Sequence, residues 1–236
     1  MKNKFFALTI VGGKGERLKP LTDDKPKPMV EINGIPIIAH QINWMKFQGV
    51  TDIIFLCGYK SELIFNYFGD GSKHGFKAHY SYEEKPLGRG GAIKKGFSMI
   101  PKSVERFLVT NGDVLTTQSL NPIIKMHSKN LSTATVMAVA YPSQYGIIES
   151  QENGLIKKFS EKSRIPFFIN GGIYIFERSI YNLLPEIGDH EVSTFPKLVK
   201  DKKISAYYSN NFWTSIETYK DLQEVQEKFE TGKIKF

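Results

Sequence analysis

Apolar runs and more polar, helix-like segments alternate along the first 140 residues of the chain. The run DIIFLCG (52–58) is apolar at nearly every position, which is typical of a strand buried on both faces of a sheet. One helix is expected to open at Pro36 and close at Gly49, and Ser61 is expected to cap the next. The pattern predicts strands over 4–11, 52–58, 77–84, 106–113 and 133–140, and helices over 36–48, 61–68, 91–100 and 120–130. This β-α-β alternation predicts a twisted, mostly parallel sheet with helices on both faces.

The pattern changes after Tyr141. Two strand-like segments flank QEN (151–153) and predict a hairpin. Beyond the hairpin, strands are expected over 168–177, 203–208 and 212–216, and helices over 178–186, 193–201 and 218–230. No low-complexity linker and no internal repeat divides the two halves. We therefore expect one α/β domain over residues 1–236, whose second half decorates the sheet.

Composition excludes several classes of protein. With 236 residues, of which 41% are apolar, the chain is long enough to bury a core. No run approaches the roughly 18 to 20 apolar residues of a membrane helix. The N-terminal apolar stretch, Phe5 to Val11, is too short for a signal peptide and is expected to be a buried strand. The single cysteine, Cys57, cannot form an internal disulfide, so a reducing cytoplasm is expected, and in its apolar run it is expected to be a small core residue.

The net charge of +8 indicates an anionic partner. The lysines and arginines are scattered along the chain, without a dense basic tail or helix. The aromatic signature of RNA-binding domains and the cysteine and histidine spacing of zinc fingers are both missing. Phosphorylated metabolites are therefore expected in preference to nucleic acid or a membrane surface.

A glycine-rich turn follows the first predicted strand. The turn GGKG (12–15) lets backbone N–H groups approach an anion, but it matches neither the dinucleotide fingerprint nor the P-loop. Taken alone, it could be only a turn. Arg17, Lys27 and the proline-stiffened KPKPM (25–29) add cations suited to the spread charge of a polyphosphate.

Together these motifs resemble the sugar-1-phosphate nucleotidyltransferases, also called nucleoside-diphosphate-sugar pyrophosphorylases. The resemblance begins in GGKGERLKPLTDDKPKPMVEINGIPII (12–38) and continues through GY (58–59), YFGDG (67–71), PLGRGGAI (86–93), NGD (111–113), YG (145–146), EK (161–162) and NGGIYIF (170–176). It is closest to mannose- and heptose-1-phosphate guanylyltransferases. It implies a Rossmann-like α/β fold without a β-helix domain, with a nucleotide-binding half over about 1–115 and a sugar-binding half over about 116–236.

The resemblance also implies a reaction and its residues. A sugar 1-phosphate oxygen attacks the α-phosphorus of a nucleoside triphosphate in line, and pyrophosphate leaves. Arg17, Lys27 and Asp113 would be catalytic. Nucleotide-binding positions would be Val11, Gly12, Gly13, Gly15, Glu83, Pro86, Leu87, Gly88, Asn111 and Gly112, and sugar-phosphate positions Gly146, Glu161, Lys162, Asn170 and Gly171. Gly90 and Gly91 would allow close approach before a helix that starts near Ala92.

Three departures from the family pattern leave alternatives open. Arg89 stands where relatives usually carry threonine, and it could contact a phosphate or face solvent. Ser163 replaces a proline after the EK pair. Ser215 stands where many relatives carry an aspartate that is the second Mg²⁺ ligand. Glu217 could reach the same ion, because residues i and i+2 of an extended segment share a face. Otherwise Asp113 would bind Mg²⁺ with phosphates and water alone, while Glu217 pairs elsewhere.

The missing aspartate also motivates a second hypothesis, a non-catalytic homologue that binds a nucleotide or nucleotide sugar as a regulatory subunit. The base and the sugar stay open at this stage, with GTP and a mannose- or heptose-type 1-phosphate as the first hypothesis. A homo-oligomer fits the resemblance, but no residue pattern specifies one.

Overall fold

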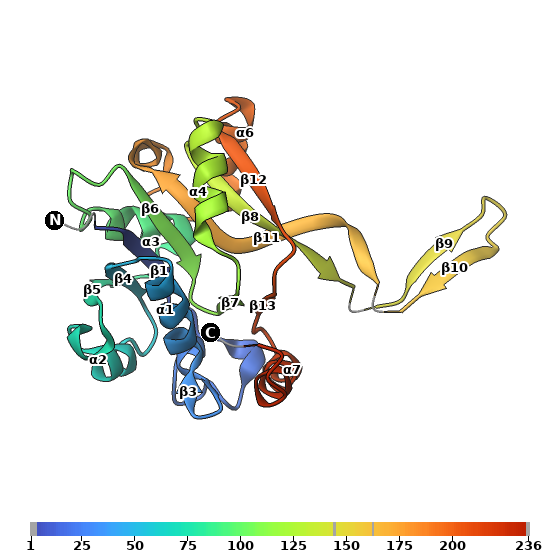
Figure 1. Cartoon of the computed structure of the whole chain (residues 1–236), viewed down its shortest axis with the longest axis horizontal. Coiled ribbons are helices and arrows are strands. Elements are labelled where there is room, and N and C mark those ends of the chain that lie inside the picture. The colour runs from blue at the N-terminus through green and yellow to red at the C-terminus, as the bar shows by residue number, and fades with distance from the viewer. Residues whose placement is uncertain (1–3, 144, 162, 235–236) are drawn as a thin grey trace.

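The computed structural model of the chain describes residues 4–143, 145–161 and 163–234. Its centre is a seven-stranded sheet in the order β12-β8-β11-β6-β1-β4-β5 (Figure 1). The strands of this sheet are β1 (Phe6–Ile10), β4 (Asp52–Cys57), β5 (Lys77–Tyr82), β6 (Arg106–Asn111), β8 (Ala134–Pro142), β11 (Arg164–Glu177) and β12 (Ile204–Ser209). β11 runs antiparallel to both of its neighbours, and the other neighbouring pairs are parallel. The expected mixed, mostly parallel sheet is confirmed.

Helices cover both faces of this sheet. The α-helices are α1 (Ile37–Phe47), α2 (Glu62–Phe68), α3 (Gly88–Phe97), α4 (Leu120–Lys129), α5 (His190–Ser193), α6 (Phe195–Lys200) and α7 (Tyr219–Glu230). Short 3-10 helices are η1 (Glu16–Leu18), η2 (Lys27–Met29), η3 (Ser72–His74) and η4 (Arg178–Leu183). Three small sheets pair β2 (Glu31–Ile32) with β3 (Ile35–Pro36), β7 (Val114–Thr116) with β13 (Trp213–Ser215), and β9 (Ile147–Ser150) with β10 (Ile156–Ser160).

Alternation along the strands divides the core into two layers. Ala7 of β1 packs in the layer that contains Ile38 of α1, whereas Leu8 packs in the layer that contains Ile93 of α3. Successive strand residues point to opposite faces, so each central strand feeds both layers. This explains why the strand run at 52–58 is apolar without interruption.

A third apolar cluster lies under α7. Leu222 and Val225 on the inner side of this helix pack with Leu18, Val30 and Ile216. The helix starts with a capping box, in which the Thr218 side chain and Asp221 satisfy each other's backbone N–H groups. Through these contacts α7 packs the C-terminal part of the chain against the segment that begins with GGKG and ends with KPKPM.

Three expectations need correction. The second half does not decorate a finished sheet, because β11 lies inside it between β6 and β8. Ser61 precedes α2, but its side chain makes no capping hydrogen bond, since its backbone is already helical. α3 starts at Gly88 and not near Ala92, so Gly90 and Gly91 lie within the helix.

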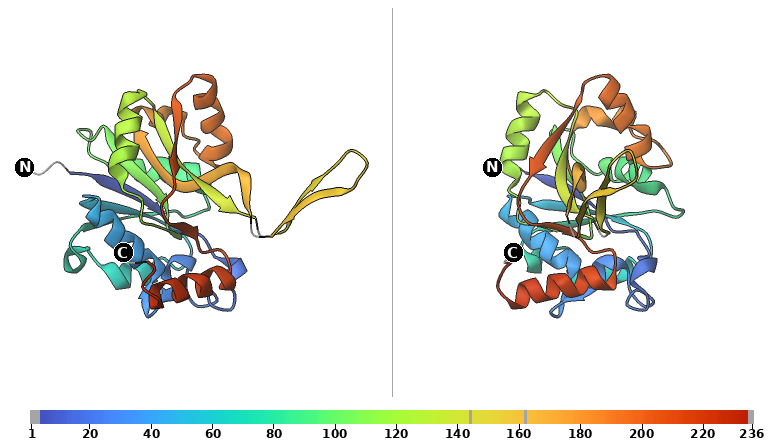
Figure 2. Two further views of the ribbon diagram at one scale, coloured as in Figure 1. Left: turned by 45° about the vertical axis from the view of Figure 1, so that its right-hand side comes forward. Right: turned by 90° about the vertical axis from the view of Figure 1, so that its right-hand side faces the viewer.

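The hairpin predicted around residues 151–153 is confirmed. β9 and β10 form an antiparallel ribbon that projects away from the rest of the molecule (Figures 1 and 2). Within the described ranges, no helix has both the length and the apolar character to cross a membrane. Cys57 is a buried free thiol whose pKa burial raises to about 12, which confirms it as a core residue.

Candidate functional site

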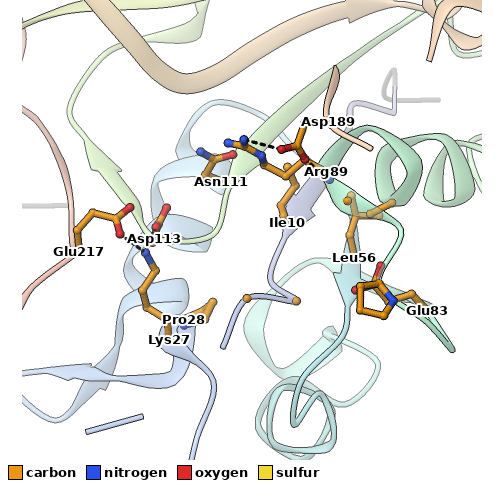
Figure 3. A pocket seen from close by; sticks show the side chains of 15 residues that line it. Ile10, Lys27, Pro28, Leu56, Glu83, Arg89, Asn111, Asp113, Asp189 and Glu217 are labelled. Carbon is orange, nitrogen blue, oxygen red and sulfur yellow. Dashed lines mark hydrogen bonds and ion pairs between the residues drawn. The ribbon is translucent and has the colours of Figure 1, made fainter. Parts of the chain in front are cut away.

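A cavity of about 360 Å³ opens where β1, β4 and β6 end (Figure 3). Ile10, Leu56 and Asn111, at or next to the carboxyl ends of these strands, lie on its wall. Side chains and glycines from other segments complete the wall: Gly12, Gly13, Lys27, Pro28, Glu83, Pro86, Gly88, Arg89, Ala92, Asp113, Asp189 and Glu217. Ligands of open α/β sheets bind at this edge, so the cavity lies where the sequence predicted it.

The glycine turn forms the floor of the cavity on the β1 side. A Cβ at Gly12 would lie 3.2 Å from the Gly58 backbone nitrogen, whereas a Cβ at Gly13 would meet nothing within 4 Å. Gly12 thus permits close packing of two loops, and Gly13 leaves open space beside the cavity. Gly15 has a φ of 68°, and a Cβ there would come within 2.7 Å of the Lys27 Cβ. It therefore lets the turn pass directly over Lys27.

Lys27 lies between two carboxylates on one side of the cavity (Figure 3). Its Nζ is in close ion-pair contact with Asp113 Oδ2 and lies 3.0 Å from Glu217 Oε2. Arg17 reaches the same Glu217 oxygen at 2.7 Å. The side chains of Lys27 and Asp113 are only 13% and 12% exposed, so water screens their attraction little. Residues widely separated in sequence thereby form one charge cluster.

Ser215 and Glu217 lie on the same side of their segment. The Ser215 hydroxyl donates to Glu217 Oε1 at 3.2 Å, while Ile216 between them is fully buried in the core beneath α7. The expectation that Glu217 projects to the side of position 215 is therefore confirmed. In the described structure its partners are cations and a hydroxyl.

The two carboxylates differ in their acidity. Burial raises the pKa of Asp113, and the adjacent Lys27 ammonium opposes this without reversing it. Burial acts in the same direction on Glu217, but Lys27 and Arg17 outweigh it, and the pKa of Glu217 falls below its ordinary value. A proton would therefore bind Asp113 first, and an additional cation beside Asp113 would keep both groups ionised.

Two acceptor atoms in this wall have no hydrogen-bond partner in the described part of the chain. They are Oδ1 of Asp113 and Oδ1 of Asn111, and both are buried. Leaving such atoms unpaired costs free energy, so a ligand, water or ion is expected to satisfy them. Among the residues that the structure describes, no three histidine, cysteine, aspartate or glutamate side chains form a ready metal cage.

A second part of the cavity is a largely apolar slot between Leu56, Pro86 and Ala92, bordered by Glu83. Glu83 Oε2 accepts the Leu87 backbone N–H at 3.0 Å, which fixes the carboxylate at the start of α3. Apolar walls with one oriented polar group are typical of a site for a flat heterocycle.

Some predicted nucleotide-binding residues do not line the cavity. Val11 is buried in the core, and Gly112 donates its N–H to the Ile10 carbonyl at 2.9 Å. Leu87 contributes a carbonyl that accepts the Gly188 N–H at 2.7 Å. Together with Gly15, these residues do not face the cavity; they pack against or hydrogen-bond to the segments that line it.

Gly90 and Gly91 have a different role from the one expected. A Cβ at Gly90 would lie 2.8 Å from the His190 nitrogen, and a Cβ at Gly91 would lie 2.4 Å from the Glu186 carbonyl oxygen. These glycines therefore let α3 pack against the 186–190 segment.

Arg89 takes part in a second charge cluster, which the sequence analysis missed. Its Nη2 lies 3.0 Å from Asp189 Oδ2, its Nη1 lies 2.9 Å from Glu191 Oε1, and its backbone N–H donates to Asp189 Oδ1 at 2.9 Å. The guanidinium is paired with two carboxylates and does not simply face solvent, while the alternative of a phosphate contact stays a prediction. No local signal marked Asp189 and Glu191, because they reach Arg89 only through the packing of α3 against a segment 100 residues later.

Buried polar groups back this second cluster. His190 is fully buried with Nδ1 3.1 Å from Glu191 Oε2, and burial lowers its pKa to about 3. Tyr174 is also fully buried, and its ring packs edge-on against the His190 ring with the centroids 5.3 Å apart. Burial raises the pKa of Glu191. The Asn170 amide donates to the Tyr174 hydroxyl at 2.8 Å. This chain of contacts connects Arg89 to a predicted sugar-binding residue.

The predicted sugar-phosphate residues that the structure describes, Gly146, Glu161, Asn170 and Gly171, lie outside the cavity wall. The carbonyl of Gly171 accepts the Trp213 indole N–H at 2.8 Å. A Cβ at Gly146 would come within 2.5 Å of the Phe159 ring, so this glycine packs beneath the base of the projecting ribbon. Glu161 is exposed beside it, and Lys162 lies outside the described residues. The structure thus brings together the triphosphate and metal candidates, but not the sugar candidates.

Comparison with known proteins gives one consistent result. The family model described as "Nucleotidyl transferase" matches residues 6–232. Mannose-1-phosphate guanyltransferase of Pichia angusta is 35% identical over 226 residues, covering 91% of this chain and 61% of that protein. The probable glucose-1-phosphate cytidylyltransferase of Bacillus subtilis is 34% identical, and 96% of each chain is covered. The chain thus spans about three fifths of the length of the guanyltransferase.

Solved structures agree in fold. The crystal structure of HddC from Yersinia pseudotuberculosis complexed with GMP-PN superposes with a TM-score of 0.75 at 28% identity, covering 95% of this chain and 99% of that one. A putative glucose-1-phosphate thymidylyltransferase from Bacillus anthracis has a TM-score of 0.77 at 20% identity, covering 98% and 97%. The second likeness concerns the fold alone.

Proposed function

Because the chain belongs to the nucleotidyl transferase family, we propose that it transfers a nucleoside monophosphate from a nucleoside triphosphate to a sugar 1-phosphate and releases pyrophosphate. Nucleotide binding is assigned to about residues 1–115 and sugar binding to about 116–236. The cavity supports the first assignment, since most of its lining precedes residue 115.

One observation carries this proposal: the cluster of Lys27, Asp113 and Glu217 beside an open glycine turn. The unpaired oxygen of the buried Asp113 carboxylate can accept a cation or a hydrogen-bond donor, and the Lys27 ammonium beside it attracts phosphate oxygens. Anion and cation sites side by side fit a metal–triphosphate complex better than either ligand alone.

The protein residues would act mainly by positioning and neutralising charge. Gly13 leaves room for phosphates against the backbone, Gly12 lets the turn pack closely against Gly58, and Lys27 offers a compact charge where the α-phosphate would lie. Arg17, on the exposed side of the cluster, would neutralise the departing pyrophosphate. No described side chain needs to form a covalent intermediate.

The residues present fit Mg²⁺. Asp113 and Glu217 supply carboxylate oxygens, and Mg²⁺ prefers one or two carboxylates with phosphates and water completing its shell. When bound, the ion would neutralise negative charge on the triphosphate. We propose Asp113 as one ligand and Glu217 as the second, with Lys27 released from between them to meet the phosphates.

We propose GTP as the nucleotide and a mannose- or heptose-type 1-phosphate as the acceptor. The mannose-1-phosphate guanyltransferase relatives and the GMP-PN complex of HddC support a guanine base, and the cytidylyltransferase relative makes CTP the main competitor. Glu83 bears on this choice, since a carboxylate at the edge of the slot could accept N–H groups from guanine. A reducing cytoplasm is the compartment proposed, on the basis of the free buried Cys57.

The test is pyrophosphate release from a matrix of four nucleoside triphosphates and several sugar 1-phosphates, with and without Mg²⁺. The expected result is release in one metal-dependent combination that contains GTP. Asp113→Asn is the matched variant, because it keeps the size of the side chain and removes its charge; it should abolish the metal-dependent signal.

The regulatory alternative has a separate outcome in the same experiment. If the protein binds a nucleotide by calorimetry but releases no pyrophosphate in any combination, the catalytic proposal fails. Release with CTP alone would keep the reaction and reject the guanine assignment.

A further inference from the structure

Helices α4 and α6 end close together, at the end of the molecule opposite α7 and at the top of Figures 1 and 2. The turns that follow them are in direct contact, because the Thr133 N–H donates to the Lys203 carbonyl at 2.7 Å. Residues 129–131 and 199–203, named here the end patch, therefore form one surface although they are far apart in the sequence.

Both helices end in a Schellman motif, in which two N–H groups beyond the helix donate to carbonyls of its last turn. The N–H groups of Leu131, Ser132, Lys202 and Lys203 donate to the carbonyls of Ser128, His127, Val199 and Leu198, respectively, at 2.8 to 3.2 Å. The motif places one residue in the left-handed region, where glycine is usual. Here these residues are Leu131, with a φ of 49°, and Lys202, with a φ of 55°. Left-handed backbone is unfavourable for a residue with a Cβ, so each of these side chains lowers stability relative to glycine.

The end patch combines exposed aliphatic side chains with lysines. Leu131 is 76% exposed and Val199 is 63% exposed. The lysines of the patch are Lys129, Lys200, Lys202 and Lys203, and all four are exposed. Within the described ranges, no carboxylate forms an ion pair with any of them. Lysines that are scattered along the sequence are thus gathered by the fold into one positive surface.

The helix dipoles account for part of this charge. The C-terminal end of a helix favours cations, and Lys129 and Lys200 lie in the last turns of α4 and α6. A glycine at position 131 or 202 would leave those two lysines in place and would relieve the backbone. The dipoles therefore give no reason for the side chains of Leu131 and Lys202, whereas a role in binding does.

We propose that the end patch docks on an anionic membrane surface. Lysines attract negatively charged lipid headgroups, and an aliphatic side chain between them can enter the boundary between headgroups and acyl chains. A nucleic acid would also attract the lysines, but it would gain nothing from an exposed leucine and valine. The combination of both kinds of side chain favours the membrane.

Docking through this patch would leave the cavity open to solvent. β8 and β12 begin at the end patch, and β6 runs parallel to β8, because β11 is antiparallel to both of them. The cavity lies where β1, β4 and β6 end, and hence at the opposite edge of the sheet. The inference goes beyond the proposed reaction and does not depend on it, so binding and turnover can be measured separately.

Cosedimentation of the full chain with lipid vesicles tests the docking surface. At low ionic strength the chain is expected to bind vesicles of phosphatidylglycerol and phosphatidylcholine, and to bind pure phosphatidylcholine at least about tenfold more weakly. The variant Lys200→Gln/Lys203→Gln should weaken binding to the anionic vesicles by about 25-fold, because each lysine contributes about fivefold. The control Lys220→Gln/Lys233→Gln removes the same charge from the opposite end of the molecule and should bind like the wild type.

The variant Leu131→Gly separates binding from folding. It removes the exposed side chain and relieves the left-handed backbone, so its melting temperature should equal or exceed that of the wild type. Its binding to the anionic vesicles should nevertheless fall by at least about tenfold. Leu155→Gly, which removes another exposed leucine far from the patch, should bind like the wild type.

Several outcomes would overturn the proposal. They are a wild type that binds neither kind of vesicle or both equally, unchanged binding in Lys200→Gln/Lys203→Gln, and unchanged binding in Leu131→Gly. Binding to a DNA duplex without binding to vesicles would assign the end patch to nucleic acid and would reject the membrane.

Discussion

Two clusters with the same kinds of charge contribute side chains to the wall of the cavity, and they differ in how firmly their cation is held. In each, one cation lies between two carboxylates: Lys27 between Asp113 and Glu217, and Arg89 between Asp189 and Glu191. Lys27 is 13% exposed, and Oδ1 of its buried partner Asp113 has neither a hydrogen bond nor an ion-pair contact among the described residues. Arg89 is 45% exposed, and Asp189 satisfies both its guanidinium and its backbone N–H, while the buried Glu191 oxygens, which accept no hydrogen bond among the described residues, lie within 2.9 Å of Arg89 and 3.1 Å of His190.

The difference separates a site prepared for a ligand from a structural clamp. A compact ammonium can move away from two carboxylates when phosphate oxygens arrive, whereas a guanidinium held by several directed contacts is fixed. We therefore expect the Lys27 cluster to control turnover, and the Arg89 cluster to control stability.

The largest effect is expected for Lys27→Ala. Removing a preorganised charge at the reacting phosphate should lower kcat by about 10²- to 10³-fold, as for other single groups that stabilise a transition state. Lys25→Ala, two residues earlier in the same loop, is the matched control and should retain most activity. Steady-state pyrophosphate release measures both. Wild-type turnover in Lys27→Ala would remove Lys27 from the mechanism.

The next largest effect is the loss of folding stability at acid pH that is expected from His190, beside the Arg89 cluster. The pKa of His190 in the folded chain is about 3, below its ordinary value of 6.5, so between these values the unfolded chain binds the extra proton. Stability from this group is thus full above pH 6.5 and declines as the pH falls toward 3. Urea unfolding at pH 7 and pH 5 should show a loss of about 2 kcal/mol from His190.

The variant His190→Phe isolates the contribution of His190 to this pH dependence. Its unfolding free energy should depend less on pH than that of the wild type, while His74→Gln should keep the full dependence. Equal pH dependence in wild type and His190→Phe would show that His190 does not carry the effect.

A smaller effect is expected for Glu217→Gln. Loss of one of two carboxylates should raise the Mg²⁺ concentration for half-maximal activity by about tenfold. Glu16→Gln, an exposed glutamate beside the same loop, should leave the titration unchanged. If Glu217→Gln also leaves it unchanged, Glu217 serves only as a partner of Lys27 and Arg17.

The smallest effect is expected for Arg89→Ala. Partly exposed ion pairs contribute little, so the unfolding free energy should fall by about 1 kcal/mol and kcat should change by less than about threefold. A double-mutant cycle with Asp189→Ala should show that most of the loss belongs to this pair. A fall in kcat of two orders of magnitude at unchanged stability would instead place the guanidinium on the substrate.

The sequence correctly predicted those strands and turns that are determined by residues close to one another along the chain. The uninterrupted apolar run at 52–58 specified a buried strand, and the QEN turn specified a hairpin. Gly90 and Gly91 were misassigned because their purpose is contact with residues 186–190, which no local pattern reveals. The same limit applies to β11, whose place between β6 and β8 depends on pairing across the whole chain.

The candidate site divides in the same way. Asp113 could be placed at the ligand edge because it follows a strand end, whereas Lys27 and Glu217 were placed beside it through the resemblance to the family pattern. Asp189 and Glu191 could not, since they come from a loop without a motif and reach the cavity only by tertiary packing. Of the sugar candidates, Gly146 and Glu161 lie beside Phe159 in the projecting β9–β10 ribbon, whereas Asn170 and Gly171 belong to β11, and no local pattern in the sequence shows how these two segments are placed relative to the cavity.

The position of β11 also has a consequence for synthesis on the ribosome. The first four strands of the sheet along the chain, ending with β6, can pair as soon as residue 111 has emerged. The outer side of β6 then stays an unpaired edge until β11, ending at Glu177, has been made. At roughly 5 to 20 residues per second, this interval lasts several seconds. A nascent chain of this topology therefore exposes a template for intermolecular pairing, and its yield in cells should depend on chaperones that cover that edge.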